Sequence, residues 1–236
     1  MDHAPRPALL WAILLLAAAV GLALRIAAAA GGLWLDEAWS AAFARDVGTP
    51  AAVFLGIHHD NNHHLNTLWL QLVCIDADPI LQRALSIASG TSSIVVAGLI
   101  VARRGVGTVA IAALLFAISP ILVTYGSEAR GYAPMLLVAL VAILVVDRWL
   151  AAPDRPPPAL GLTVVCLIGT LAQMTMVFAL AALAGWIVVR RWSAAGPARA
   201  LVDTARAIGP ASVVSGLTVL AILRWLPGPG GFRIGS

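Results

Sequence analysis

Long apolar stretches recur along the chain, and they restrict its possible folds more than any other feature. A helix needs roughly 20 mostly apolar residues to cross the hydrocarbon core of a bilayer. Stretches of this kind lie at residues 8–30, 80–102, 106–125, 132–146, 159–189 and 208–226. Only 11% of the 236 residues are charged, whereas soluble proteins carry about 25%. The chain is therefore predicted to be an all-α membrane protein, which excludes a soluble enzyme, a disordered protein and a nucleic-acid-binding module.

The stretch 159–189 is too long for one simple crossing, and polar residues around Gln173 interrupt it. We expect two short helices that turn near Gln173, which gives a bundle of about seven membrane helices. Three alanines at 28–30 also match a signal-peptide cleavage site, but Arg25 interrupts the first apolar run and further spans follow, so a membrane helix is favoured. No internal repeat divides the chain, and residues 1–236 are expected to form a single transmembrane domain.

The distribution of arginine predicts the orientation of these helices. All 15 basic residues are arginine, and basic residues are enriched in cytoplasmic loops. The arginines on one side of the apolar stretches are Arg6, Arg103, Arg104, Arg148, Arg155, Arg190, Arg191, Arg199 and Arg206. That side and the N-terminus are predicted to be cytoplasmic, while residues 31–78, residues 126–131 and the C-terminal residue are predicted to lie outside. We thus expect a multi-pass protein of the cell membrane.

The first outer segment, residues 31–78, is expected to carry the functional site. It contains six of the 11 acidic residues and four of the five histidines. The segment is too polar to cross the membrane, but residues 65–75 have the pattern of an amphipathic helix at the membrane surface. We therefore expect a partly helical extracytoplasmic loop.

Asp36 and Glu37 are neighbouring carboxylates that directly follow an apolar triplet. Charges beside a bilayer are costly unless they have an electrostatic role. In a water-poor site, one carboxylate of such a pair can act as a general base or hold a cation. Alternatively, Asp36 caps a surface helix that starts near Ala38, because aspartate stabilises a helix N-terminus. Their position alone leaves both interpretations open.

The most polar run of the chain is His-His-Asp-Asn-Asn-His-His at residues 58–64. His59 and His63 are four residues apart, so a helix would place them on one face. Such a face could bind a transition metal. The favoured alternative is a hydrated loop that leads into the surface helix, because no cysteine or glutamate completes a ligand set.

Glu128, Arg130 and Tyr132 lie in a very short outer loop between two apolar stretches. An arginine can grip a phosphate through two parallel hydrogen bonds, and Glu128 could orient Arg130 for that task. The alternative is an interfacial ion pair without a ligand. Arg25 lies a turn or two inside the membrane and needs an acidic partner or a phosphate, for which the outer carboxylates are the candidates. We expect five charged residues to converge on one outer cavity, namely Asp36, Glu37, Asp60, Glu128 and Arg130.

Six short pieces of sequence follow one another in a characteristic order. They are Leu-Arg at 24–25, Leu-Trp-Leu-Asp-Glu-Ala-Trp-Ser at 33–40, Asp-Asn-Asn-His-His-Leu-Asn-Thr-Leu at 60–68, Arg-Ala-Leu-Ser at 83–86, Ser-Pro at 119–120 and Tyr-Gly-Ser-Glu-Ala-Arg-Gly-Tyr at 125–132. This order resembles the N-terminal half of a GT-C fold glycosyltransferase, and it is most similar to bacterial enzymes of the protein O-mannosyltransferase and aminoarabinose transferase type. The resemblance implies a GT-C-like bundle in a bacterial plasma membrane, and we expect the chain to be the N-terminal part of a longer transferase.

The resemblance also implies an activity, which is the inverting transfer of a sugar from a polyprenyl-phosphate-sugar donor on the extracytoplasmic face. The acceptor would be a glycan, a lipid or a protein. Asp36 matches the family's catalytic acidic residue, Glu37 matches its neighbour, and Asp60 matches the second acidic position of the same loop. Arg130 is expected to meet the donor phosphate, and Arg25 is the second candidate for this contact. A divalent cation is a candidate cofactor.

The chain departs from the family pattern in two ways. Relatives carry two prolines where this chain has His63 and His64, which concerns the acceptor side of the site. Members of the family are also longer, so a non-catalytic assembly subunit or an inactive, truncated fragment is the main alternative function. A transporter fits less well, because the charges lie at the outer surface and the apolar stretches show no broken helix at the membrane centre.

Overall fold

The computed structural model describes residues 7–57, 63–74 and 76–225, with the backbone alone at Trp225, and the regular elements in these ranges are all helices. Five are long and apolar enough to cross a membrane: α1 (Pro7–Ala28), α5 (Pro79–Ile100), α8 (Tyr132–Leu150), α10 (Met176–Ala195) and α11 (Pro197–Leu220). Two further apolar helices are shorter, namely α6 (Val106–Ile118), which α7 (Pro120–Tyr125) continues after a break, and α9 (Ala159–Ala172). The all-α membrane class is confirmed, while the count of seven spans stays a prediction.

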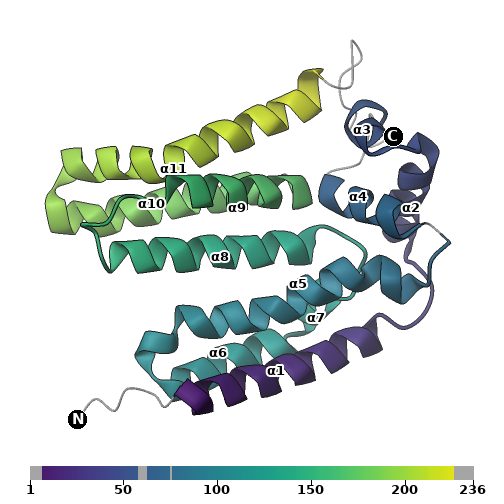
Figure 1. Cartoon of the computed structure of the whole chain (residues 1–236), viewed down its shortest axis with the longest axis horizontal. Helices are drawn as coiled ribbons and strands as arrows, with labels where there is room; N and C mark the ends of the chain where they lie inside the picture. Colours follow the sequence, from purple (N-terminus) through teal and green to yellow (C-terminus); the bar gives the residue numbers. More distant parts are fainter. Residues whose placement is uncertain (1–6, 58–62, 75, 226–236) are drawn as a thin grey trace.

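The long helices form two groups joined by α8 (Figure 1). In one group, Leu14 of α1 packs against Ile94 of α5 and Val109 of α6. In the other, α9, α10 and α11 pack together around buried residues such as Leu162 and Ile187. Helix α5 packs against α8 and so connects the two cores. Large apolar side chains also cover much of the outer surface, including Leu15, Leu16, Leu115, Phe178 and Val189. Water would disfavour such a surface, but lipid accommodates it.

Three short helices gather at one end of the bundle, which we call the α2–α4 end (Figure 1). They are α2 (Leu35–Val47), α3 (Pro50–Leu55) and α4 (His64–Val73). Helix α3 starts at a proline and is capped by Thr49, whose hydroxyl accepts a hydrogen bond from the Ala52 N–H at 3.3 Å. The expected partly helical loop is therefore present, and the surface helix predicted at 65–75 spans His64–Val73.

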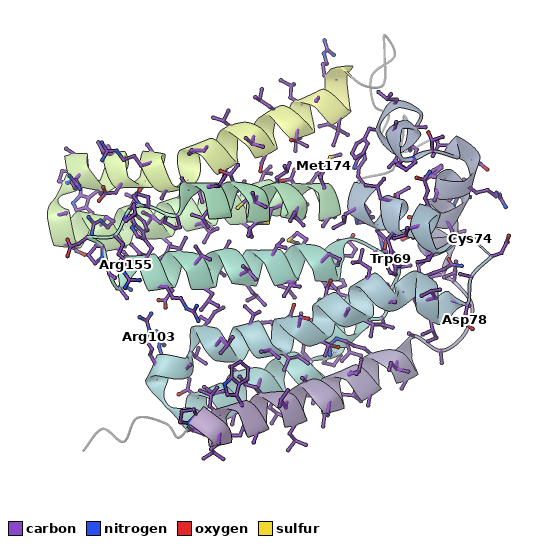
Figure 2. All side chains as sticks on the ribbon, in the orientation of Figure 1. Trp69, Cys74, Asp78, Arg103, Arg155 and Met174 are labelled. Carbon is purple, nitrogen blue, oxygen red and sulfur yellow. The ribbon has the colours of Figure 1, made fainter. Side chains whose placement is uncertain are left out.

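The opposite end of the bundle carries arginines, and we call it the arginine end. Figure 2 shows Arg103 and Arg155 there, far from Trp69, Cys74 and Asp78 at the α2–α4 end. Arg103, in a 3-10 turn (η1, Ala102–Arg104) after α5, forms an ion pair with Asp147 of α8. Arg103 and Arg155 thus lie at one end of the bundle, as their sequence positions indicate. The assignment of that end to the cytoplasm stays a prediction.

The last long helix differs from its predicted extent. We expected a span at 208–226, but α11 begins at Pro197 and continues through Pro210. A proline at the first position of a helix suits the required backbone angle, and Arg199 pairs with Asp203 one turn later at 3.1 Å. These contacts stabilise a polar first half that hydropathy alone does not reveal. Pro210 lies inside α11 without ending it, and Figure 1 shows that the helix changes direction along its length.

Cysteine labelling tests the predicted orientation. In a Cys74→Ser background, which removes the exposed native thiol and keeps the buried Cys166, single cysteines are placed at the exposed positions Asp46 and Arg104. A membrane-impermeant maleimide should modify the Asp46→Cys protein in intact cells and the Arg104→Cys protein only after permeabilisation. Modification of the Arg104→Cys protein in intact cells would show that the predicted orientation is wrong and that the candidate site does not lie on the extracytoplasmic side.

Candidate functional site

The first turn of α2 directs its two carboxylates to different surroundings. Successive residues of a helix point about 100° apart, so Asp36 and Glu37 cannot face the same way. The Asp36 side chain is 62% exposed, whereas that of Glu37 is 1% exposed. Glu37 also accepts a hydrogen bond from the Trp34 N–H at 2.8 Å, which closes the first turn of α2. The capping function that we considered for Asp36 therefore belongs to Glu37, and the helix starts at Leu35 instead of near Ala38.

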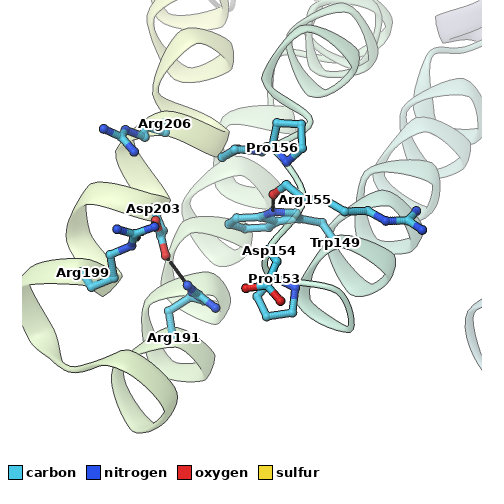
Figure 3. A pocket seen from close by; sticks show the side chains of 10 residues that line it. Trp149, Pro153, Asp154, Arg155, Pro156, Arg191, Arg199, Asp203 and Arg206 are labelled. Atoms are coloured by element: carbon cyan, nitrogen blue, oxygen red, sulfur yellow. Dashed lines mark hydrogen bonds and ion pairs between the residues drawn. The ribbon is translucent and has the colours of Figure 1, made fainter.

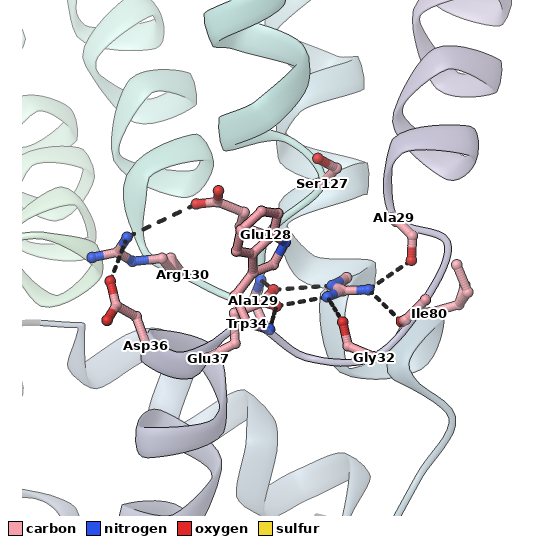
Figure 4. A network of polar contacts seen from close by, with 12 residues as sticks. Ala29, Gly32, Trp34, Asp36, Glu37, Ile80, Ser127, Glu128, Ala129 and Arg130 are labelled. Atoms are coloured by element: carbon pink, nitrogen blue, oxygen red, sulfur yellow. Dashed lines mark hydrogen bonds and ion pairs between the residues drawn. The ribbon is translucent and has the colours of Figure 1, made fainter.

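Glu37 forms a buried ion pair with Arg83 of α5 (Figure 4). Arg83 donates from Nε to Oε1 at 3.0 Å and from Nη2 to Oε2 at 2.6 Å, a two-pronged geometry. The same guanidinium donates to the carbonyls of Ala29 at 2.6 Å, Gly31 at 3.0 Å and Gly32 at 2.8 Å. Arg83 therefore fastens the end of α1 and the following loop to the start of α2.

The carboxylate of Glu37 reaches one more segment. Its Oε1 accepts a hydrogen bond from the backbone N–H of Ala129 at 2.5 Å, in the loop between α7 and α8. Burial raises the pKa of Glu37, but the hydrogen bonds from Arg83, Ala129 and Trp34 outweigh this effect and hold the pKa below its usual value. Both carboxylate oxygens are occupied. The geometry therefore suits Glu37 to positioning its neighbours and makes it a poor proton acceptor.

Asp36 lies on an open cavity of about 260 Å³ lined also by Trp34, Glu37, Glu128 and Arg130. Its Oδ2 lies 3.2 Å from Nη1 of Arg130, and Oε2 of Glu128 lies 4.0 Å from the same nitrogen. Burial raises the pKa of Glu128, an effect that the charge of Arg130 partly offsets. The structure thus brings Asp36, Glu37, Glu128 and Arg130 to one place. Asp60, which we expected beside them, lies outside the described residues.

Tyr132 completes the surroundings of Arg130. The Arg130 guanidinium lies 4.8 Å from the centre of the Tyr132 ring, and its Nη2 lies 3.4 Å from the Tyr132 hydroxyl. Tyr132 in turn stacks on Tyr125 of α7 with 4.8 Å between ring centres. An arginine held by its flat face keeps its edge available for an anion. Tyr132 therefore contacts Arg130 directly, and a supporting role for Tyr132 in the site stays a prediction.

His63 lies behind this group and links it to the α9–α10 turn. The Gly131 N–H donates to its Nδ1 at 3.3 Å, and the same nitrogen lies 3.4 Å from the carbonyl oxygen of Ala172. Burial, and then the charge of Arg130, lower the pKa of His63 to about 4, so the ring is neutral at neutral pH. The chain turns at Gln173, as predicted, and this turn lies beside the loop that carries Arg130.

The predicted metal site is only partly within the described residues. His63 is described, but His59 and Asp60 are not. Among the residues that are described, no three histidine, cysteine, aspartate or glutamate side chains are grouped to hold a metal ion. Binding of a transition metal or a divalent cation therefore stays a prediction.

Arg25 does not join the cavity. Its side chain is buried between α1, α5 and the junction of α6 and α7, where it donates to the carbonyl of Phe116 at 3.2 Å and to that of Leu122 at 3.3 Å. Pro120 has no N–H, so the carbonyl of Phe116 loses its usual helical donor four residues later. Arg25 replaces that donor. The acidic or phosphate partner that we expected for Arg25 is replaced by backbone carbonyls.

Sequence analysis did not assign a role to Arg83, although the Arg-Ala-Leu-Ser motif at residues 83–86 carries part of the family resemblance. The available signal was its position in the second turn of an apolar helix, where an arginine needs a partner. The same reasoning was applied to Arg25, and Glu37 was among the carboxylates considered as its partner. The correct partner of Glu37 is Arg83.

Comparison of the whole chain with protein-family models, with curated proteins and with solved structures gave no match. The resemblance to GT-C transferases is therefore supported by the ordered motifs alone.

The buried pair is expected to dominate the stability of this end of the bundle. Glu37→Gln leaves the Arg83 charge buried without a counter-charge, and such changes cost about 3–5 kcal/mol. Unfolding of the purified protein in detergent measures the loss. The matched control is Asp46→Asn, which breaks an exposed pair with Arg45 and should cost less than about 1 kcal/mol. Equal losses in the two variants would show that the buried pair does not hold these segments.

Proposed function

We propose that this protein is an inverting glycosyltransferase that uses a polyprenyl-phosphate-sugar donor on the extracytoplasmic side of the membrane. The observation that carries the proposal is the 3.2 Å approach of Asp36 to Arg130 on an open cavity. The two residues come from separate segments that both belong to the ordered family motifs. A carboxylate next to a guanidinium combines a proton acceptor with a group that stabilises a departing phosphate.

The proposed reaction assigns one task to each residue. Asp36 accepts the proton of the acceptor hydroxyl while the hydroxyl oxygen attacks C1 of the sugar. The bond between C1 and the phosphate oxygen breaks on the opposite side, which inverts the anomeric carbon. The lipid phosphate leaves with the bonding electrons, and Arg130 stabilises its growing negative charge. Glu128 and Tyr132 hold Arg130 in place for this contact.

The position of Asp36 supports its use as the base. Its side chain is largely exposed, so an acceptor can reach it, and Arg130 is its ion-pair partner. When a donor phosphate takes over the Arg130 guanidinium, the Asp36 carboxylate becomes free to accept a proton. Glu37, in contrast, already has both of its oxygens occupied within the protein.

An apolar groove on the membrane-embedded part of the bundle supports a lipid-linked donor. The groove measures about 370 Å³ and lies between α8 and α10, where Ala139, Ile143, Ala179 and Trp186 line it. Ala139 follows Tyr132 by seven residues, so both lie on nearly the same face of α8, roughly 10 Å apart along the helix axis. A polyprenyl chain lying in this groove would bring its phosphate toward Arg130.

Membranes that contain the full-length protein and radiolabelled polyprenyl-phosphate sugars provide the test. Asp36→Asn keeps the shape of the side chain but removes the proton acceptor, so the transfer rate should fall by about 10²–10⁴-fold. Donor binding should be retained in this variant, whereas Arg130→Gln should weaken it. Assays with and without a chelator show whether a divalent cation takes part.

Asp46→Asn is the matched control, because Asp46 lies on the same helix but in its exposed last turn. It should transfer sugar at the normal rate. Normal turnover in a folded Asp36→Asn protein would exclude Asp36 as the base. Absence of transfer from any labelled donor by the folded wild-type protein would favour an assembly subunit.

A further inference from the structure

Figure 3 shows a second pocket, of about 300 Å³. Arg155, which lines it, lies at the arginine end, far from the α2–α4 end (Figure 2). The pocket is formed between the segment that follows α8 and the corner where α10 turns into α11. The residues that matter for its chemistry are Trp149, Asp154, Arg191, Arg199, Asp203 and Arg206.

Three of these residues form a charged stripe along α11. Arg199, Asp203 and Arg206 are spaced four and three residues apart, which places them on one face of the helix. Asp203 is 4% exposed. Its Oδ2 accepts hydrogen bonds from Nε and Nη2 of Arg191 at 2.8 Å and 2.5 Å, and its Oδ1 lies 3.1 Å from Nε of Arg199. One buried carboxylate therefore faces two guanidinium groups.

The pocket carries more positive than negative charge. Arg206 is exposed and has no ion-pair partner among the described residues. Asp154 lies on the rim of the pocket and is exposed as well. Four arginines line the pocket, against the two carboxylates of Asp154 and Asp203; they are Arg155, Arg191, Arg199 and Arg206. The remaining charge suits an anion, and guanidinium groups match the geometry of a phosphate.

The location of the pocket adds a second constraint. Trp149 lines it near the end of α8, and the indole N–H donates to the carbonyl of Arg155 at 3.2 Å. Tryptophan at a helix end is typical of the headgroup level of a membrane. Basic pockets between membrane helices at this level bind the headgroups of anionic lipids.

We propose that this pocket is a binding site for a phosphate ester, which Arg199 and Arg206 bind from one face of α11 beside the Arg191–Asp203 pair. The phosphate belongs to an anionic lipid headgroup or to a soluble phosphate compound. The site is independent of the proposed sugar transfer, because it lies at the other end of the bundle.

Native mass spectrometry and lipid titration of the protein in nanodiscs provide the test. Nanodiscs of phosphatidylglycerol and of phosphatidylcholine compare an anionic headgroup with a zwitterionic one, and millimolar inorganic phosphate added to the phosphatidylcholine sample probes a soluble ligand. The test variant is Arg199→Gln with Arg206→Gln. The matched control is Arg104→Gln with Arg148→Gln. It removes the same charge from two exposed arginines at the arginine end of the bundle that do not line the pocket.

Phosphatidylglycerol or phosphate should bind to the wild type and the control, and the test variant should bind about 30-fold more weakly, or roughly fivefold for each lost arginine. Asp154→Asn should strengthen binding, an effect that a purely structural role of the pocket would not produce. Binding of phosphatidylglycerol alone identifies the source as lipid, and binding of inorganic phosphate alone identifies it as soluble. Equal binding to the test and control variants, or no binding in either arm, would overturn the site.

Discussion

The buried ion pair between Arg83 and Glu37 joins three stretches that are distant in the sequence: residues 29–37, Arg83 of α5 and Ala129. Arg83 makes five hydrogen bonds, as many as its guanidinium has N–H groups. They reach the end of α1, the loop after it and the first turn of α2. The carboxylate of Glu37 adds the loop between α7 and α8 through Ala129. Removal of one partner would leave a charge buried among polar groups that depend on it.

The geometry of the candidate site follows from this pair. Asp36 directly precedes Glu37, and Arg130 directly follows Ala129. Because Glu37 binds the Ala129 N–H, the residues next to each of them are brought together, and Asp36 meets Arg130 at 3.2 Å. The cavity is therefore assembled by residues that do not themselves provide its accessible chemistry. Glu37 thus has a structural role, while its neighbour Asp36 stays exposed beside Arg130.

The sequence predicts those features that depend on local physics. Apolar runs identify the membrane helices, and the polar break at Gln173 identifies the turn between α9 and α10. The partners of Arg25 and Arg83 could not be predicted, because both arginines stand near the α2–α4 end of an apolar helix. Packing distinguishes them: a side chain at Gly90 or Gly126 would collide with Arg25.

Pro120 adds a second reason why Arg25 and Arg83 differ. It removes the backbone donor that would otherwise bind the carbonyl of Phe116, and Arg25 fills that vacancy. The extent of α11 was mispredicted for a similar reason, because its first half is stabilised by the contacts of Asp203 with Arg191 and Arg199. A hydropathy profile does not reveal ion pairs of this kind, whether they lie within α11 or join α10 to α11.

Arg25, Arg83 and Arg130 differ in how firmly the protein holds them, and this difference bears on function. Arg83 is fully engaged by the protein, and Arg25 donates to several carbonyls in a buried place. The side chain of Arg130 is 26% exposed and has looser contacts, at 3.2 Å to Asp36 and 4.0 Å to Glu128. An ion pair that is open to solvent contributes little to stability, so an incoming phosphate can replace it at small cost. The structural arginines keep the cavity in shape, and Arg130 is the arginine of the three that can exchange its partner for a ligand.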